Sequence, residues 1–205
     1  YDVARGLRDR GTFNPGDDIE PRWSPDGHRL AFSSRRKGHL DLYAKASDGT
    51  GDEELLLADD LDKHAQSWSP DGRFLLYVGI GAETGQDVWV LPLFGDRKPR
   101  PLLQARYSEG TPQFSPDGRW IAYRSNETGR VEVYVMPFPG PGGQQQISTQ
   151  GGEFPRWRRD GKEIVYLAPD GKLMAVNVTS DRTRRGRRTP WPPSPGPSRT
   201  RGAPR

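Results

Sequence analysis

The chain has 205 residues, with 25 glycines, 20 prolines, no cysteine and a hydrophobic content of 32%. The lack of cysteine excludes disulfides, thiolate metal sites and a cysteine nucleophile, and no apolar stretch approaches the roughly 18 residues of a membrane-spanning helix. Residues 1–180 carry 23 Lys and Arg against 26 Asp and Glu (−3), whereas residues 181–205 carry eight Arg and one Asp (+7). The basic balance therefore belongs to the tail, and no nucleic-acid partner is expected for the folded part.

A five-residue motif recurs along the chain at nearly even spacing. It reads WSPDG at 23–27 and 68–72, FSPDG at 114–118 and WRRDG at 157–161. The motif aspartates lie 45, 46 and 43 residues apart (26 to 71, 71 to 117, 117 to 160). Such a period is typical of proteins built from repeated supersecondary units.

Each motif has the residues of a tight turn between two antiparallel strands. Proline presets φ for the first corner, aspartate accepts hydrogen bonds from nearby backbone N–H groups, and glycine adopts the left-handed conformation. We assign a structural turn role to Pro25, Asp26, Gly27, Pro70, Asp71, Gly72, Pro116, Asp117, Gly118, Asp160 and Gly161.

The segments between the motifs have the period-two alternation and the Val, Leu and aromatic enrichment of strands. In chain order, the second strands are predicted to start at Leu30, Leu75, Ile121 and Ile164. Third strands are predicted at 41–46, 87–93, 132–138 and 172–178. Weaker outer strands are predicted at 54–58, 100–104 and 144–149. No segment of the first 180 residues has a convincing helical pattern.

Four antiparallel strands per 45 residues is the size of one propeller blade. We therefore predict an all-β fold, a β-propeller of four-stranded antiparallel blades. A closed ring needs roughly four to eight blades, so the expectation is a partial propeller with three full blades and one incomplete blade. The predicted segments are an outer strand of a preceding blade at 1–18, blades at 19–60, 61–107 and 108–150, an incomplete blade at 151–180, and a disordered Arg/Pro-rich tail at 181–205.

The repeated motif, followed each time by an apolar strand, resembles the TolB-type, WD-like propeller repeats. Such repeats occur in bacterial periplasmic proteins and in the propeller lids of prolyl-oligopeptidase-type peptidases. The stretches DLYAKASDG, DVWVLPLFGDRKPRPLLQ and WRRDGKEIVYLAPDGKLMAVNV are most similar to the carboxy-terminal propeller sensor region of acidobacterial eukaryotic-like serine/threonine kinases. The resemblance covers residues 1–180 and implies a propeller outside the cytoplasmic membrane.

No catalytic or cofactor pattern emerges from the residues. There is no Gly-x-Ser-x-Gly elbow, no glycine-rich phosphate loop and no His-Arg-Asp catalytic loop. Acidic clusters at 17–20, 52–54 and 59–62 fall in predicted loops and are interpreted as solvated charge. Three histidines without ligand-like spacing predict no metal site; His64 is the single candidate ligand. We expect no catalytic residues, no cofactor and no enzyme activity in this chain.

Binding remains, and a propeller topology indicates where to look for it. The innermost strand of each blade lines the central channel, and it precedes the repeated aromatic residue. These segments differ between units, although the turns stay the same. The predicted ligand-binding residues at the channel mouth are Asp18, Glu20, Arg22, His64, Gln66, Glu109, Glu153 and Arg156.

The sequence therefore predicts a non-catalytic propeller that binds a protein, a peptide or a small ligand. Its expected context is the sensor region of a membrane-anchored bacterial kinase or a TolB-like protein, in the periplasm or another extracytoplasmic location. The alternative is the substrate-gating propeller of a prolyl-oligopeptidase-type serine peptidase. Self-association that completes the ring is a further expectation, because an open array leaves sheet faces exposed at its ends.

Overall fold

The computed structural model of the protein describes residues 10–81, 85–140, 142–178 and 188–190, and all regular secondary structure in these ranges is β-strand. This confirms the predicted all-β class. The first two sheets consist of β1 Asp18–Trp23, β2 Arg29–Lys37, β3 His39–Ala46 and β4 Glu54–Leu57, then β5 Asp62–Trp68, β6 Phe74–Gly81, β7 Gly85–Pro92 and β8 Arg100–Leu103. The next two consist of β9 Glu109–Phe114, β10 Trp120–Ser125, β11 Glu132–Pro137 and β12 Gln145–Gln146, then β13 Glu153–Trp157, β14 Glu163–Leu167, β15 Leu173–Asn177 and β16 Arg188–Pro190.

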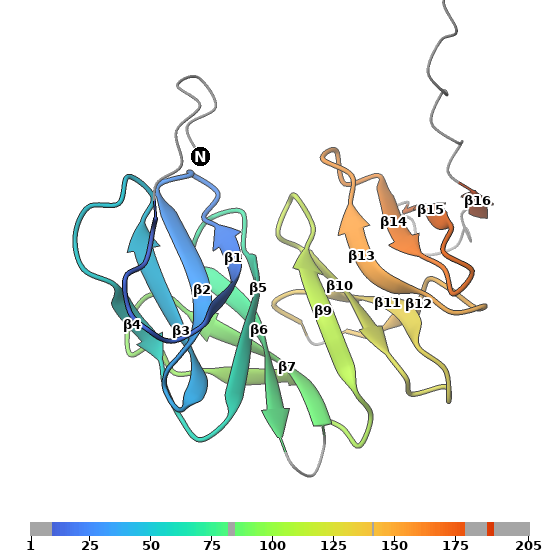
Figure 1. The fold of residues 1–205 in the computed structure, drawn as a ribbon. Helices are drawn as coiled ribbons and strands as arrows, with labels where there is room; N and C mark the ends of the chain where they lie inside the picture. Colours follow the sequence, from blue (N-terminus) through green and yellow to red (C-terminus); the bar gives the residue numbers. More distant parts are fainter. Residues whose placement is uncertain (1–9, 82–84, 141, 179–187, 191–205) are drawn as a thin grey trace, which may run out of the picture.

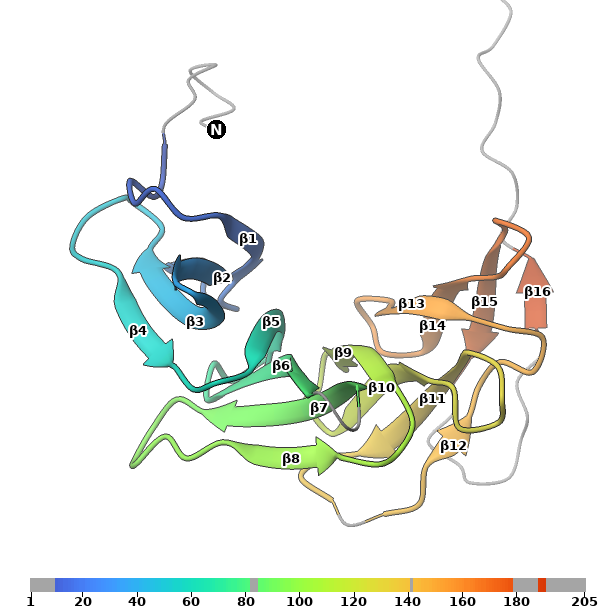
Figure 2. The same ribbon diagram turned by 60° about the horizontal axis from the view of Figure 1, so that its bottom comes forward.

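Each sheet has its four strands in chain order, and every neighbouring pair is antiparallel. The four sheets follow one another around an arc (Figures 1 and 2), with β1, β5, β9 and β13 on the concave side and β4, β8 and β12 on the outside. We call the sheets blades 1 to 4 and their first strands the inner strands. The arrangement is a partial propeller, as the sequence predicts.

The repeated motif forms the turn between the first and second strands of every blade. The Gly27 N–H donates to the Ser24 carbonyl over 2.9 Å, and Gly27 has a φ of 73°, a conformation that glycine adopts without a steric penalty. Asp26 Oδ1 accepts from the Ser24 hydroxyl (2.6 Å) and from the His28 N–H (3.0 Å). In the fourth turn no serine is present, and Arg158 Nε donates to Asp160 Oδ1 instead, over 2.8 Å.

The hydrophobic cores lie between the blades. Ala31, Leu42 and Ala44 of blade 1 pack against Trp68 and Tyr77 of blade 2. The equivalent layers join blade 2 to blade 3 and blade 3 to blade 4. Because each blade buries its apolar faces only against its neighbours, the stability of the array depends on these interfaces.

The aromatic residue of the motif connects each blade to the blade before it. Trp68 Nε1 donates to the Arg22 carbonyl (2.9 Å), and Trp157 Nε1 donates to the Gln113 carbonyl (3.2 Å). Trp68 is 8% exposed, whereas Trp23 in blade 1 is 60% exposed. This position therefore packs between blades at Trp68, Phe114 and Trp157, whereas Trp23 presents its indole to solvent.

Two details differ from the sequence expectations. The fourth sheet contains a short outer strand, because β16 pairs with β15 at Ala175 and Thr189, whereas blade 4 was expected to stop after three strands. This strand lies within the expected disordered tail, whose residues 181–187 and 191–205 are outside the described residues. Residues 10–17 form no strand, and residues 1–9 of the expected preceding blade are also outside the described residues.

Candidate binding site on the concave face

All four inner strands carry the same backbone irregularity, a register shift that interrupts their pairing with the second strands. In β1, β9 and β13 a non-glycine residue with positive φ lies at the shift: Glu20 (56°), Thr111 (49°) and Phe154 (52°). Each of them precedes a proline, a residue that sheets accept at bulges because it lacks an N–H donor. Such conformations cost about 1–3 kcal/mol each and cluster at functional sites.

The residue just before the motif aromatic is the first to pair again after the register shift. This position holds Arg22, Ser67, Gln113 and Arg156 in blades 1 to 4. Since each of the four belongs to an inner strand, the positions are distributed along the concave wall of the arc (Figure 2). Sequence reasoning included the two arginines and missed Ser67 and Gln113, although their place before the aromatic could have identified them.

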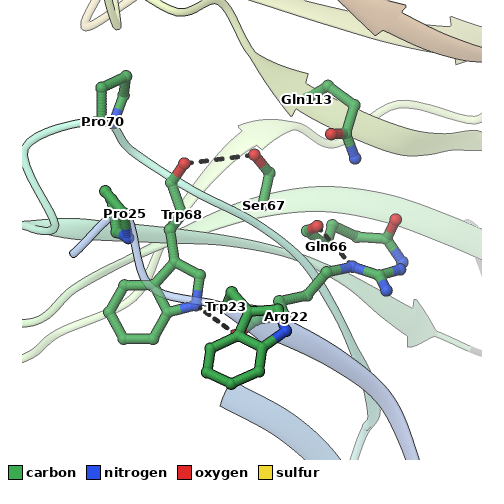
Figure 3. Close-up of a pocket in the computed structure, with 8 residues that line it drawn as sticks. All are labelled: Arg22, Trp23, Pro25, Gln66, Ser67, Trp68, Pro70 and Gln113. Atoms are coloured by element: carbon green, nitrogen blue, oxygen red, sulfur yellow. Dashed lines mark hydrogen bonds between the residues drawn. The ribbon is translucent and has the colours of Figure 1, made fainter. Parts of the chain in front are cut away.

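A pocket of about 310 Å³ opens between the ends of β1, β5 and β9. Its lining residues come from three inner strands and two turns: Arg22, Trp23, Pro25, Gln66, Ser67, Trp68, Pro70 and Gln113. In Figure 3 the Arg22 guanidinium lies beside Gln66, and the two indoles lie on the other side of the site. The pocket thus combines polar groups with aromatic surface, the usual composition of a binding site.

The two wall arginines make few contacts of their own. Arg22 Nε donates to the Gln66 carbonyl (2.7 Å), and its Nη1 donates to the Pro21 carbonyl (3.2 Å). Arg156 Nη1 donates to the Pro155 carbonyl (2.8 Å). Among the described residues neither guanidinium forms an ion pair with a carboxylate. Partial burial and the positive charge of Arg22 lower the pKa of Arg156.

Glu20 and His64 form a polar contact between blades 1 and 2. His64 Nδ1 lies 3.0 Å from Glu20 Oε2. The hydrogen bond to Glu20 raises the pKa of His64, although burial acts in the opposite direction. The sequence predicted both residues at the mouth, and the structure pairs them.

Three predicted mouth residues are held in other contacts. Asp18 Oδ1 lies 3.3 Å from Arg36 Nη2; burial alone would raise the pKa of Asp18, but hydrogen bonds from Ser34, Thr12 and Arg36 lower it. Gln66 is 8% exposed, and its backbone carbonyl accepts from Arg22. Glu109 is also buried between blades 2 and 3. Glu153 lies on β13, and no contact of its carboxylate is found within the described ranges.

A second repeated position carries a buried carboxylate at the blade interfaces. Asp41, Asp87 and Glu132 each lie two residues before the aromatic of the third strand, and all are buried. Asp41 Oδ1 accepts from Lys63 Nζ of the next blade over 3.1 Å. Asp87 instead faces Glu109, whose pKa rises to about 7 through burial and through the negative charges of Asp87 and Glu127.

The third such carboxylate, Glu132, accepts from backbone and hydroxyl donors. The Gly151 N–H donates to both of its oxygens at 3.0 Å, and the Ser148 hydroxyl also donates to it. Within the described ranges no three His, Asp or Glu side chains are grouped so as to hold a metal ion. A search of the same ranges for helices long and apolar enough to cross a membrane finds none.

Comparisons with known proteins agree with this architecture. The chain is 28% identical over 152 residues to the uncharacterized protein Atu1656 of Agrobacterium fabrum, covering 73% of this chain and 50% of the relative. It is 29% identical over 177 residues to the uncharacterized peptidase YuxL of Bacillus subtilis, covering 66% of this chain and 27% of the relative. The chain thus spans half or less of the length of these curated relatives.

The fold likeness extends to solved structures. The crystal structure of TolB from Acinetobacter baumannii matches with a TM-score of 0.68 at 20% identity, covering 85% of this chain and 43% of that one. The family model described as the TolB beta propeller domain matches residues 62–189, which is more than half of the chain. The chain therefore belongs to the TolB β-propeller domain family.

Proposed function

We propose that the concave wall binds a protein or peptide segment, and that the chain acts by recognition, without chemistry of its own. The observation that carries this proposal is the contrast between the repeated turn and the residue just before its aromatic. The turns after the inner strands are nearly identical, whereas the residue before the aromatic changes between Arg22, Ser67, Gln113 and Arg156. A repeated scaffold with unlike side chains on one surface is the usual construction of a specific binding surface.

The predicted mouth residues divide into two groups under this proposal. Glu20, His64 and Arg22, with Glu153 and Arg156 across the wall, contribute to the binding surface. Asp18 and Glu109 are held in contacts within or between blades, and Gln66 is largely buried at the pocket; we assign these three a supporting role. The proposal involves no metal ion and no cofactor.

The setting that we propose is the sensor region of a membrane-anchored bacterial kinase, or a TolB-like scaffold, outside the cytoplasm. The similarity of residues 41–49, 87–104 and 157–178 to kinase-linked propellers supports the first, and membership of the TolB family supports the second. The sequence of the complete gene tests this setting. If the chain is a kinase sensor region, we expect the gene to encode a kinase domain and a membrane span before residue 1.

A second candidate is the gating propeller of a serine peptidase. The sequence similarity to the uncharacterized peptidase of Bacillus subtilis, which is 29% identical over 66% of this chain, favours it. In that case a Gly-x-Ser-x-Gly hydrolase domain follows in the gene, and the same concave wall contacts peptide substrates on their way to that domain.

Selection from a peptide display library tests the binding role directly. Peptides selected on the immobilised protein are measured against Gln113→Trp, which fills the pocket, and against Arg100→Trp on the outer strand β8 as a matched control. We expect the pocket variant to weaken the selected peptides by about tenfold or more, which corresponds to about 1.4 kcal/mol. Selected peptides that bind both variants equally would place recognition elsewhere.

A further inference from the structure

We propose that the pocket between β1, β5 and β9 binds a proline-containing segment of an extended peptide. A proline ring of the ligand packs on the Trp23 indole, and the backbone carbonyls beside it accept hydrogen bonds from Arg22 and Gln113. This inference rests on the proposed binding function and names the ligand class of that surface. All the residues that carry it line one pocket, and they come from neighbouring inner strands and the turns that follow them.

The pocket opens beside a pair of turns that does not pack as the later pairs do. Pro70 of blade 2 lies close to the turn of blade 3, since a Cβ atom placed on Gly118 would be 3.3 Å from Pro70 Cδ. In the turns of blades 3 and 4 the corresponding distance is 3.8 Å. At Gly72, the equivalent position facing blade 1, the same Cβ would meet no atom within 4 Å. The turn of blade 1 therefore stands apart from that of blade 2, and Pro25 stays accessible.

Exposed rings form the apolar half of this pocket. Trp23 is 60% exposed, and Pro25 and Pro70 are exposed as well. In Figure 3 these rings lie toward the left, beside the buried indole of Trp68. Aromatic-lined grooves bind proline-rich segments, because the polyproline conformation forms before binding and little conformational entropy is lost. The volume of about 310 Å³ is at the lower end of the range for ligand sites, which suits a compact ring.

The polar half of the pocket is rich in hydrogen-bond donors. Arg22 directs Nε and Nη1 to backbone carbonyls, and no partner of its Nη2 is found among the described residues. The side-chain amides of Gln66 and Gln113 likewise have no partner there, and none of the lining residues is acidic. Proline has no N–H, and a polyproline segment makes no internal hydrogen bonds, so its backbone presents free carbonyl acceptors. Such a ligand matches the donors of the pocket.

The indole at this repeat position already binds an extended backbone elsewhere in the chain. Trp68 Nε1 donates to the Arg22 carbonyl (2.9 Å) and Trp157 Nε1 to the Gln113 carbonyl (3.2 Å), each on the inner strand of the preceding blade. Trp23 Nε1 has no acceptor within the described ranges. A peptide that lies along the exposed indole in an extended conformation supplies the carbonyl that this N–H lacks.

Three fluorescent peptides of one length, with blocked ends and the same dye, test the ligand class. They are Gly-Ser-Pro-Pro-Ser-Pro-Pro-Ser-Gly and the same peptide with Ala or with Leu in place of every Pro. Binding to the whole chain is measured by anisotropy at low and physiological salt. We expect the proline peptide to bind about tenfold more tightly than the other two. Because the peptide sequences carry no charge, we expect the same preference at both salt concentrations.

Variants of the lining residues locate the contact. Trp23→Ala removes the ring and is expected to abolish the preference for proline, whereas Trp23→Phe keeps an aromatic face without the N–H and should keep part of it. Gln113→Met removes the amide at nearly constant size and should weaken the proline peptide severalfold. Phe13→Ala is the matched control, since Phe13 is 72% exposed and lies outside the pocket; it should leave the preference unchanged. Circular dichroism melting of each variant checks the fold.

The remaining outcomes overturn the inference in distinguishable ways. If the proline and leucine peptides bind equally and Gln113→Trp blocks both, the binding function holds and the proline class is wrong. The proline class is also wrong if library peptides bind while none of these three does, or if Trp23→Ala keeps the full preference. If neither these peptides nor any library peptide binds, the proposed function fails as well.

Discussion

The interface between blades 1 and 2 and the interface between blades 2 and 3 have the same construction but opposite electrostatics. In the first, buried Asp41 meets Lys63, which also contacts Asp59. In the second, Asp87 occupies the position of Asp41, and Glu109 occupies the position of Lys63. The comparison teaches that a repeated fold accepts either a cation or a protonated acid at one buried position, because both forms avoid two facing charges of the same sign.

The most damaging change to this comparison is Lys63→Met. The methionine has nearly the size of lysine but leaves Asp41 buried without its cation. Removing one partner of a buried ion pair typically costs about 3–5 kcal/mol, and we expect a loss of this size in urea unfolding. Lys98→Met is the control, since Lys98 pairs with Asp96 on the surface; a similar loss in both variants would contradict the assignment.

Glu109→Gln sharpens the comparison through its pH dependence. The pKa of Glu109 is about 7 in the folded protein, against an ordinary value of 4.5. Between these values the folded state binds the extra proton, so the free energy of unfolding falls as the pH rises from 4.5 to 7 and stays low above it. We expect the variant to match the wild type at pH 5 and to exceed it by about 2–3 kcal/mol at pH 8.

Urea unfolding at pH 5, 6, 7 and 8 measures this difference. The groups that face Glu109 are Asp87, Glu127 and the hydroxyl of Ser125, and all three are present in both proteins. Asp96→Asn, at an exposed carboxylate, serves as the control and should follow the wild type. A constant offset between Glu109→Gln and the wild type across the series would show that no proton is taken up at Glu109.

Glu132→Gln tests the third interface and has the smallest expected effect. Glu132 is satisfied by the Gly151 N–H and the Ser148 hydroxyl, and Arg130 lies 2.9 Å from it. A glutamine retains one acceptor and loses the charge, so we expect a loss of about 1–2 kcal/mol. Urea unfolding measures this loss, and an unchanged free energy of unfolding would mean that the charge of Glu132 contributes nothing to the interface.

The blades and their turns could be predicted from the sequence because local chemistry determines them. The Ser-Pro-Asp-Gly spacing specifies a turn on its own, and the alternation after Leu30 or Leu75 specifies a strand. Trp23 shows the limit of this reasoning: its register matches that of Trp68, but its exposure depends on whether a blade packs before it. Register gives the position of a side chain within its blade, and a neighbouring blade decides its burial.

The sequence indicated the strands on which the predicted mouth residues lie, but not the contacts of their side chains. All eight predicted mouth residues lie on inner strands, because the position before the aromatic identifies those strands. The sequence could not indicate that Asp18 turns to Arg36 or that Glu109 faces Asp87, since both contacts depend on side chains from other strands. The strand β16 was missed because residues 188–190 follow an arginine-rich stretch without apolar alternation.

The prolines of the inner strands have a consequence for solubility. Each inner strand is the free edge of its sheet, and free edges can recruit strands from other molecules and start aggregation. Pro21, Pro112 and Pro155, each directly after a positive-φ residue, remove a hydrogen-bond donor and bend the edge, so an added strand cannot pair along it. Blade 2 has Gln66 at this point, and β5 is therefore the inner edge with the least protection against intermolecular strand addition.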